Sequence, residues 1–205
     1  MKNVIVTAAL ALTSSAFAAT WEIDSSHASA NFSVKHLGVT NVNGTLGVVS
    51  GKFEADDKDL TKSKIEASID LKAIDTKFGK RDDHLRSPDF FDVEKFPALT
   101  FKSTKIEKVS DTKLKITGDL TMHGVTKPVT LDAELSGEVK NPFSGTMTRA
   151  VAATGVLNRQ DWGLKWQAPA EAVKVVGDEV KISIEAELAK KEAAAAPAKG
   201  APAKK

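Results

Sequence analysis

The chain has 205 residues, a formal net charge of +2 and no cysteine. The lack of cysteine excludes thiol catalysis, zinc–thiolate sites and disulfide bonds. The positive charge belongs to the two ends, because residues 190–205 carry five lysines and one glutamate and the first residues carry Lys2. Removing these charges leaves a net −3 on residues 19–189, which argues against a nucleic-acid-binding domain with its basic face.

Residues 1–18 have the pattern of an export signal. Lys2 forms a short basic region, an apolar run follows, and Ala16-Phe17-Ala18 fits a small-x-small cleavage site. The apolar run is shorter than the ~20 residues that span a bilayer. A buried N-terminal strand is the alternative, but no strand period precedes Trp21. We therefore expect a signal peptide, a mature chain that starts at Ala19, and a soluble periplasmic protein.

Apolar and polar side chains then alternate along most of residues 19–189, which form one expected domain. Such alternation predicts antiparallel strands with one dry and one wet face. The clearest runs are 28–35, 64–71, 113–122, 129–135 and 180–188, with shorter ones in 46–55, 99–106 and 147–157. Turn sequences such as "NVNG", "VSDTK" and "HGVTKP" separate them. The pattern predicts an all-β fold of about eight strands.

One stretch, "GKRDDHLRSPDFFDVEKFPALTF", interrupts the alternation at residues 79–101. Ser87-Pro88-Asp89 has the order of a helix start: an N-cap, a proline at the first helical position and an acid in the first turn. We therefore expect one short helix inserted near residues 82–92. The same stretch places charged side chains directly before phenylalanines, as at the rim of an apolar pocket.

About eight strands with one dry face can close into a barrel or stack as a sandwich. An eight-stranded barrel either fills with side chains or holds one small ligand. Several inward positions carry small residues, namely Ala28, Ala30, Ala67, Gly118, Ala133, Gly137 and Ala186. Small residues leave room but also allow tight packing, so the periodicity leaves a hollow and a filled interior equally open.

Five motifs carry a resemblance to a known family: "WEIDSSHASANFSVKHL", "GKFEAD", "RDDHLRSPDFFDVEKFPALTFKS", "GDLTMHGVTKPVTL" and "NRQDWGL". In this order the chain resembles the YceI-like family of lipid- and polyisoprenoid-binding proteins from about Thr20 to Leu188. The resemblance implies an exported protein with a lipocalin-like antiparallel barrel around an elongated apolar tunnel that holds an isoprenoid. Residues 190–205 match no family motif, and their Ala/Pro/Lys composition predicts a disordered tail.

Strand parity and the resemblance together select the residues expected to contact a lipid. The predicted lipid-binding residues are Phe32, Val34, Ile69, Leu85, Phe90, Phe91, Phe101, Leu120, Leu131, Trp162 and Leu164. Phe90 and Phe91 are expected at a lid, and Trp162 and Leu164 in an aromatic wall. No metal site and no cofactor is predicted.

A second set is expected at the mouth, either near the lipid headgroup or as a structural lock. It comprises His36, Arg81, Asp82, His84 and Arg159. His36 shares the inward parity of Phe32 and Val34. Arg159 and Asp161 are expected to meet the "RDDH" segment across the barrel end, where paired charges more often fix loops than perform chemistry.

The predicted function is therefore an exported binding protein, not an enzyme. It would hold one long isoprenoid-type lipid, such as a polyisoprenoid, a quinone or a prenyl pyrophosphate, for storage or transport. The expected partners are this lipid and a transient membrane contact, but no nucleic acid. Two alternatives stay open: a hydrolase that acts on a lipid phosphate through His84, Asp82 and Arg159, and a periplasmic stress or interaction protein.

Overall fold

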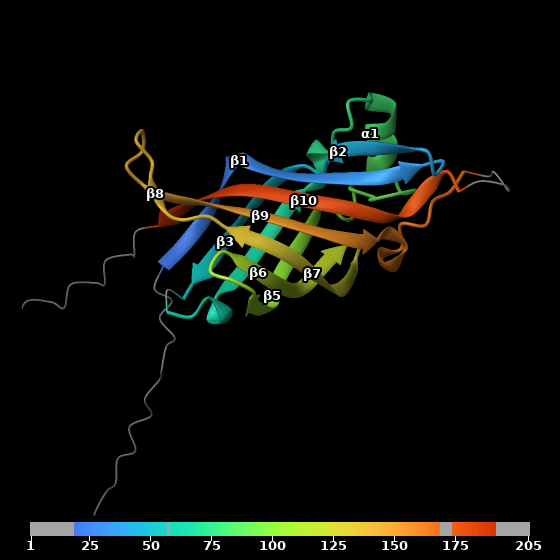
Figure 1. The fold of residues 1–205 in the computed structure, drawn as a ribbon. Helices are drawn as coiled ribbons and strands as arrows, with labels where there is room; N and C mark the ends of the chain where they lie inside the picture. The colour runs from blue at the N-terminus through green and yellow to red at the C-terminus, as the bar shows by residue number, and fades with distance from the viewer. Residues whose placement is uncertain (1–18, 57, 169–173, 192–205) are drawn as a thin grey trace, which may run out of the picture.

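A computed structural model describes residues 19–56, 58–168 and 174–191 (Figure 1). The strands are β1 (Ala19–His36), β2 (Thr40–Thr45), β3 (Val48–Ala55), β4 (Lys64–Asp70), β5 (Ala98–Lys108), β6 (Lys113–Met122), β7 (Val125–Leu135), β8 (Val139–Lys140), β9 (Met147–Asn158) and β10 (Val176–Lys191). The helices are α1 (Gly79–Arg86) and the 3-10 helices η1 (Leu60–Lys62), η2 (Leu71–Ala73) and η3 (Arg159–Trp162). The predicted signal peptide and most of the predicted tail lie outside the described residues.

Eight of the strands close into an antiparallel barrel. Their order is β10-β1-β3-β4-β5-β6-β7-β9, and β9 pairs back onto β10 to complete the ring. The two remaining strands lie outside the ring, where β2 pairs with β1 and β8 with β9. The prediction of an antiparallel barrel of about eight strands with one short helix is therefore confirmed, and a sandwich is excluded.

The alternation in the sequence is what orients the barrel wall. In β6 the apolar positions Leu114, Ile116, Leu120 and Met122 are buried, whereas Lys115 and Asp119 between them are exposed. The register places Ile116 of β6 directly opposite Leu131 of β7. Because alternate residues of a strand point to opposite faces, this register turns the buried apolar residues of both strands inward.

The short helix lies earlier than the sequence predicted. α1 spans Gly79–Arg86 and overlaps only part of the predicted range 82–92, because Ser87 is its C-cap and not an N-cap. The Ser87 hydroxyl donates to the carbonyl of His84 in the last turn. Pro88 has no N–H and cannot continue a helix, so a proline just after a C-cap ends one as readily as it starts the next.

The last strand is longer than expected. β10 continues to Lys191 and pairs along its whole end with the beginning of β1, where Trp21 lies opposite Lys190 and Thr20 opposite Lys191. The pairing with β1 therefore places residues 190 and 191 in the barrel, although composition assigned them to the tail.

The two barrel ends are built differently. At the end where β1 begins, Trp21, Phe53 and Leu188 belong to one buried apolar cluster. At the other end the connection between β4 and β5, which contains η2 and α1, lies across the barrel (Figure 1). Among the described residues, no helix has both the length and the apolarity needed to cross a bilayer.

Candidate binding site

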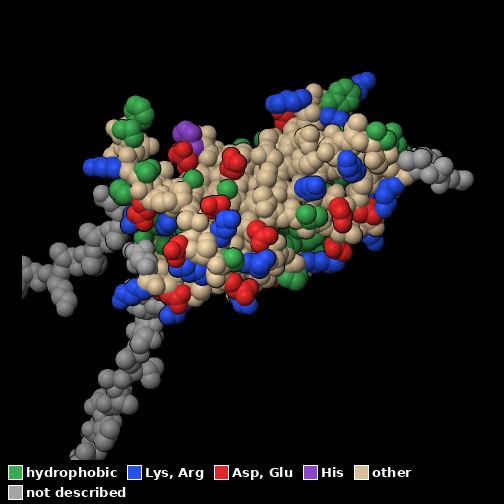
Figure 2. All heavy atoms as spheres, viewed as in Figure 1, with side chains coloured by type: hydrophobic (Ala, Val, Ile, Leu, Met, Phe, Trp, Pro, Cys, Tyr) green, Lys and Arg blue, Asp and Glu red, His purple; other side chains and the backbone are tan. Residues whose placement is uncertain are grey.

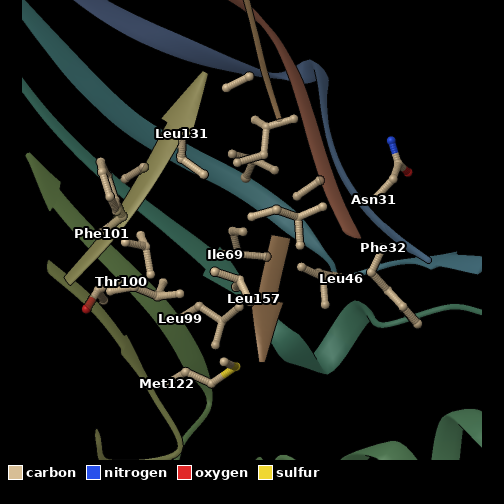
Figure 3. A pocket seen from close by; sticks show the side chains of 18 of the residues that line it. Asn31, Phe32, Leu46, Ile69, Leu99, Thr100, Phe101, Met122, Leu131 and Leu157 are labelled. Carbon is tan, nitrogen blue, oxygen red and sulfur yellow. The ribbon is translucent and has the colours of Figure 1, made fainter. Parts of the chain in front are cut away.

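The barrel encloses an apolar cavity with a volume of about 220 Å³. Figure 3 shows side chains of several strands that point into it, among them Ile69, Leu99, Leu131 and Leu157. A packed protein core has few voids larger than a water molecule, and one water needs roughly 10–15 Å³ of such space. The interior is therefore hollow, which decides between the two possibilities that the periodicity left open.

Ten of the eleven predicted lipid-binding residues line this cavity. They are Phe32, Val34, Ile69, Leu85, Phe90, Phe91, Phe101, Leu120, Leu131 and Leu164. Their contact with a lipid stays a prediction. Trp162 is buried but is not among the lining residues, because its indole Nε1 donates to the carbonyl of Leu120 at 3.1 Å. Trp162 thus packs behind the wall.

Other lining residues did not enter the predicted set. Leu99 and Met122 line the cavity and share the strand parity of Phe101 and Leu120, so parity alone identifies them. Leu46 and Leu157 also line it. Leu46 lies between β2 and β3 and Leu157 in the weakly patterned end of β9, and neither position gives a clear signal in the sequence.

The small inward residues have different roles. Ala30, Ala67 and Ala186 line the cavity and leave it open. Gly118 instead allows the Phe101 ring to pack against the backbone, since a Cβ at position 118 would lie 2.4 Å from the Cζ atom of Phe101. Gly137 is exposed and does not face the interior. Together with Ala153, four alanines therefore line the cavity, and neither of these glycines does.

The lid of the cavity is α1 together with the turn that follows it. Leu85 comes from the helix, and Phe90 and Phe91 come from the turn, so both phenylalanines line the cavity. The amide of Phe91 donates to the carbonyl of Leu85 at 3.0 Å, which folds the turn back onto the helix. Asp92, at the end of this turn, has a left-handed backbone with φ of 47°.

Arg81 and Asp82 fasten the start of α1. The buried Asp82 carboxylate accepts hydrogen bonds from the amide and the hydroxyl of Thr76. Arg81 donates from Nε to the Thr76 hydroxyl at 2.7 Å and from Nη2 to the Thr76 carbonyl at 2.9 Å. Because both side chains are engaged with Thr76, this arrangement favours a structural lock over headgroup contact.

Arg159 is even more completely engaged. It is only 4% exposed and donates to the carbonyls of Leu164, Trp166, Val176 and Gly177 and to the Asp178 carboxylate. A guanidinium has five N–H donors, and here each has an acceptor. Burial lowers the pKa of the Arg159 side chain, and the nearby Asp178 carboxylate opposes this shift. Because Arg159 has no donor left for a lipid headgroup, its contacts also indicate a structural role.

The predicted direct meeting of Arg159 and Asp161 with the "RDDH" segment is wrong. Asp161 pairs with Lys127 at 3.4 Å, and Arg159 pairs with Asp178. The two segments meet through Trp166, whose carbonyl accepts from Arg159 while its ring packs edge-on against His84 at 4.9 Å between centroids. An aromatic contact replaces the expected ion pair.

His84 and His36 also differ from a catalytic arrangement. The Nε2 atom of His84 lies 2.8 Å from the Asp89 carboxylate, and its ring packs against Phe90 at 5.0 Å. His36 is half-buried and does not line the cavity, contrary to its predicted inward parity. At this point the β1–β10 pairing shifts register, because β10 has four residues where β1 has two, whereas β1 pairs regularly with β2 through His36.

A second polar cluster lies on the outer surface. Asp24, His27 and Glu187 hold their potential ligand atoms within 4.8 Å of one another. Hydrogen bonds from the Ser26 hydroxyl, from His27 at 2.9 Å and from the Ser26 amide lower the pKa of Asp24 to about 2, and the bond to Asp24 raises the pKa of His27. Sequence reasoning missed this cluster because only the β1–β10 pairing brings Glu187 opposite Asp24. None of the three residues lines the cavity.

The polar side chains predicted for a hydrolytic centre are each engaged in other contacts. A nucleophile or activated water must lie beside a base that a third group orients. Within the described residues, the Asp82 carboxylate accepts hydrogen bonds from Thr76, and the His84 ring contacts the Asp89 carboxylate. The Arg159 guanidinium donates to backbone carbonyls. These three side chains therefore stabilise the loops at this end of the barrel, and the cavity itself is lined mainly by apolar side chains.

Comparison with known proteins agrees with this geometry. A UPF0312 protein of Vibrio parahaemolyticus is 43% identical over 148 residues, which cover 71% of this chain and 78% of that protein. The crystal structure of Burkholderia cenocepacia BcnA superposes with a TM-score of 0.70 at 19% identity, covering 80% of this chain and 98% of that one. At 19% identity, this similarity shows that the two proteins share a fold.

A second solved structure is a polyisoprenoid-binding domain from Saccharophagus degradans, with a TM-score of 0.61 and 15% identity. It covers 83% of this chain and 98% of that one. The family model of the YceI-like domain matches residues 21–188, which include every strand of the barrel in whole or in part. The chain therefore belongs to the YceI-like family.

Proposed function

We propose that the protein is an exported periplasmic carrier that holds one long isoprenoid-type lipid in its barrel. The observation that carries this proposal is the hollow apolar cavity, which runs from Phe53 and Leu188 near one end to Phe90 and Phe91 under the lid. Family membership and the polyisoprenoid-binding neighbour support a lipid as the ligand class. The export pattern of residues 1–18 supports the location.

The wall chemistry favours an uncharged lipid chain. Burial of each CH2 group is worth about 0.8 kcal/mol relative to water, and an apolar wall supplies this term to any hydrocarbon. A charged pyrophosphate would need several free donors. Arg159 has none to spare, and Lys52 pairs with Glu54 at 2.9 Å. Of the candidate ligands, a polyisoprenoid or a quinone therefore suits the interior better than a prenyl pyrophosphate.

The free energy of lipid transfer favours reversible carriage over irreversible capture. A lipid that leaves a bilayer was already shielded from water there, so the gain from CH2 burial nearly cancels. The lipid can then pass in both directions without a large free-energy difference. Storage or shuttling across an aqueous compartment fits this balance better than irreversible capture.

Native mass spectrometry of the gently purified protein, followed by lipid extraction, tests the proposal. We expect one bound lipid per chain, and uptake of an added polyprenol or ubiquinone by the delipidated protein. A chain that carries no lipid and takes up neither compound would contradict the proposal. Turnover of a prenyl pyrophosphate that disappears in His84→Ala would instead favour the hydrolase alternative.

A further inference from the structure

The lid end of the barrel exposes apolar side chains to water. Val39 is 77% exposed, Phe78 is 55% exposed and Leu37 is 44% exposed. Leu37 and Val39 lie in the turn between β1 and β2, and Phe78 directly precedes α1. Figure 1 shows this turn and α1 at the same end of the barrel. We call Leu37, Val39 and Phe78 the apolar tip.

The backbone of the tip is held in an unfavourable conformation. Leu37 has φ of 54°, and Lys77, which precedes Phe78, has φ of 63°. A left-handed backbone is unfavourable for residues other than glycine. Strain of this kind persists where the surrounding structure enforces it, and such positions cluster at functional sites. Here both strained residues are at or next to exposed apolar side chains.

Cations surround the tip. The guanidinium of Arg81 lies 5.6 Å from the centre of the Phe78 ring, and Lys77 and Lys80 flank the same residue. Lys77 is paired with Asp75, but in the described part of the chain Lys80 has no ion-pair partner. Figure 2 shows hydrophobic and basic side chains together over α1. This combination matches a surface that carries negative charge above an apolar interior.

The tip is also connected to the lid. Phe78 is the N-cap of α1, and its carbonyl accepts from the amides of Arg81 and Asp82. Seven residues later in the same segment, Leu85 lines the cavity. A surface that holds Phe78 therefore lies against the part of the protein that covers the lipid cavity.

From these observations we propose that the apolar tip docks on a bilayer that contains anionic lipid. Apolar side chains enter the headgroup region, and each nearby lysine adds about a fivefold gain in affinity at low salt. The opposite end has its own exposed phenylalanine, Phe143 at 98% exposure, but no α-helix within the described part of the chain. Membrane docking by the tip does not depend on which lipid occupies the barrel. An experiment can therefore contradict the docking proposal without contradicting the proposed function, and the reverse.

The absence of cysteine in the chain allows a direct test. Val39→Cys and, as a matched control at the other end, Phe143→Cys each accept one environment-sensitive dye in the full-length protein. With vesicles of equimolar phosphatidylglycerol and phosphatidylcholine, we expect the dye at position 39 to shift to the blue and the dye at position 143 to stay unchanged. Pure phosphatidylcholine vesicles or high salt should abolish the shift.

Variants then test the tip itself. In the labelled Val39→Cys protein, Phe78→Ser should weaken vesicle binding about tenfold, and Lys80→Ala about fivefold at low salt. Equal shifts at positions 39 and 143 would indicate unspecific adsorption, and a shift only at 143 would place the membrane at the other end. A shift that needs no vesicles and grows with protein concentration would assign the tip to a second copy. Each of these three results overturns the proposal.

Discussion

The carboxylate of Asp82 and the hydroxyl of Thr76 are joined by a buried hydrogen bond, and the Thr76 amide donates to the same carboxylate. This pair connects the first turn of α1 to the segment that leaves η2. Because Thr76 also accepts from Arg81, one threonine holds two side chains of the lid helix.

Replacement of Asp82 by alanine should therefore destabilise the protein. The Thr76 amide and hydroxyl would remain buried without an acceptor, which costs about 1–3 kcal/mol. Urea unfolding measures this loss, and Asp82→Asn, which keeps an acceptor oxygen, should lose less. If Asp82→Ala unfolds like the wild type but no longer binds lipid, the carboxylate contacts the headgroup and the lock assignment is wrong.

Replacement of Arg159 should have a larger effect. Lysine has only three donors, so Arg159→Lys leaves at least two of the five acceptors unpaired, and we expect a loss of roughly 3 kcal/mol. The exposed neighbour Asp161 supplies the control, since Asp161→Asn should change the free energy of unfolding by about 0.5 kcal/mol or less. An Arg159→Lys protein of normal stability with altered lipid preference would argue for a headgroup role.

A bulky residue at position 30 should block the cavity. Ala30 is fully buried and lines the open space, so the indole of Ala30→Trp can occupy it without displacing the wall. We expect lipid uptake to fall while the melting temperature changes little. In a filled core the same substitution would overpack, at a cost of about 1–3 kcal/mol.

The control for this substitution is Ala152→Trp on the exposed face of β9, which should leave uptake unchanged. A sharp drop in melting temperature together with intact uptake in Ala30→Trp would show that the lipid does not pass this position.

The Asp24–His27 pair should make the outer surface sensitive to pH. The hydrogen bond that the His27 ring donates to the Asp24 carboxylate raises the pKa of His27 above 6.5, so its stabilising contribution is complete below 6.5 and is lost as the pH rises through the folded-state value. The pKa of Asp24, lowered from 3.8 to about 2, gives stability that is present above 3.8 and lost as the pH falls toward 2.

NMR titration of the His27 ring protons measures this shift. Asp24→Asn should return the His27 pKa toward 6.5, and added salt should reduce the difference because both side chains are exposed to solvent. A wild-type His27 that titrates at or below 6.5 would contradict the predicted pairing.

Periodicity was sufficient for the barrel wall but not for its exceptions. Phe32, Phe101 and Leu120 follow the alternation into the cavity, whereas His36 shares the parity of Val34 but does not line it. Trp162 has the right apolarity, but its indole N–H finds an acceptor behind the wall. Alternation within one strand predicts only which side of that strand a residue faces. It does not predict contacts with other parts of the chain, such as the hydrogen bond of Trp162.

The lid shows a different limit. The sequence Ser87-Pro88-Asp89 satisfies the rules for a helix start, yet α1 ends there. Serine and proline serve at both ends of helices, and only the preceding turn shows which end is present. The resemblance to the YceI-like family placed the charged and aromatic stretch at the mouth, but did not show that Trp166 joins His84 to Arg159.

The pairing of β1 with β10 also constrains how the protein is made. β1 begins at Ala19 and its partner ends at Lys191, so almost the whole chain separates the two edges that close the ring. Such a distant contact is entropically costly and forms slowly. Until the last strand has emerged, β1 and β9 remain open edges that can pair with other chains. An incomplete chain therefore has no enclosed interior, and folding must wait for the final residues of the domain.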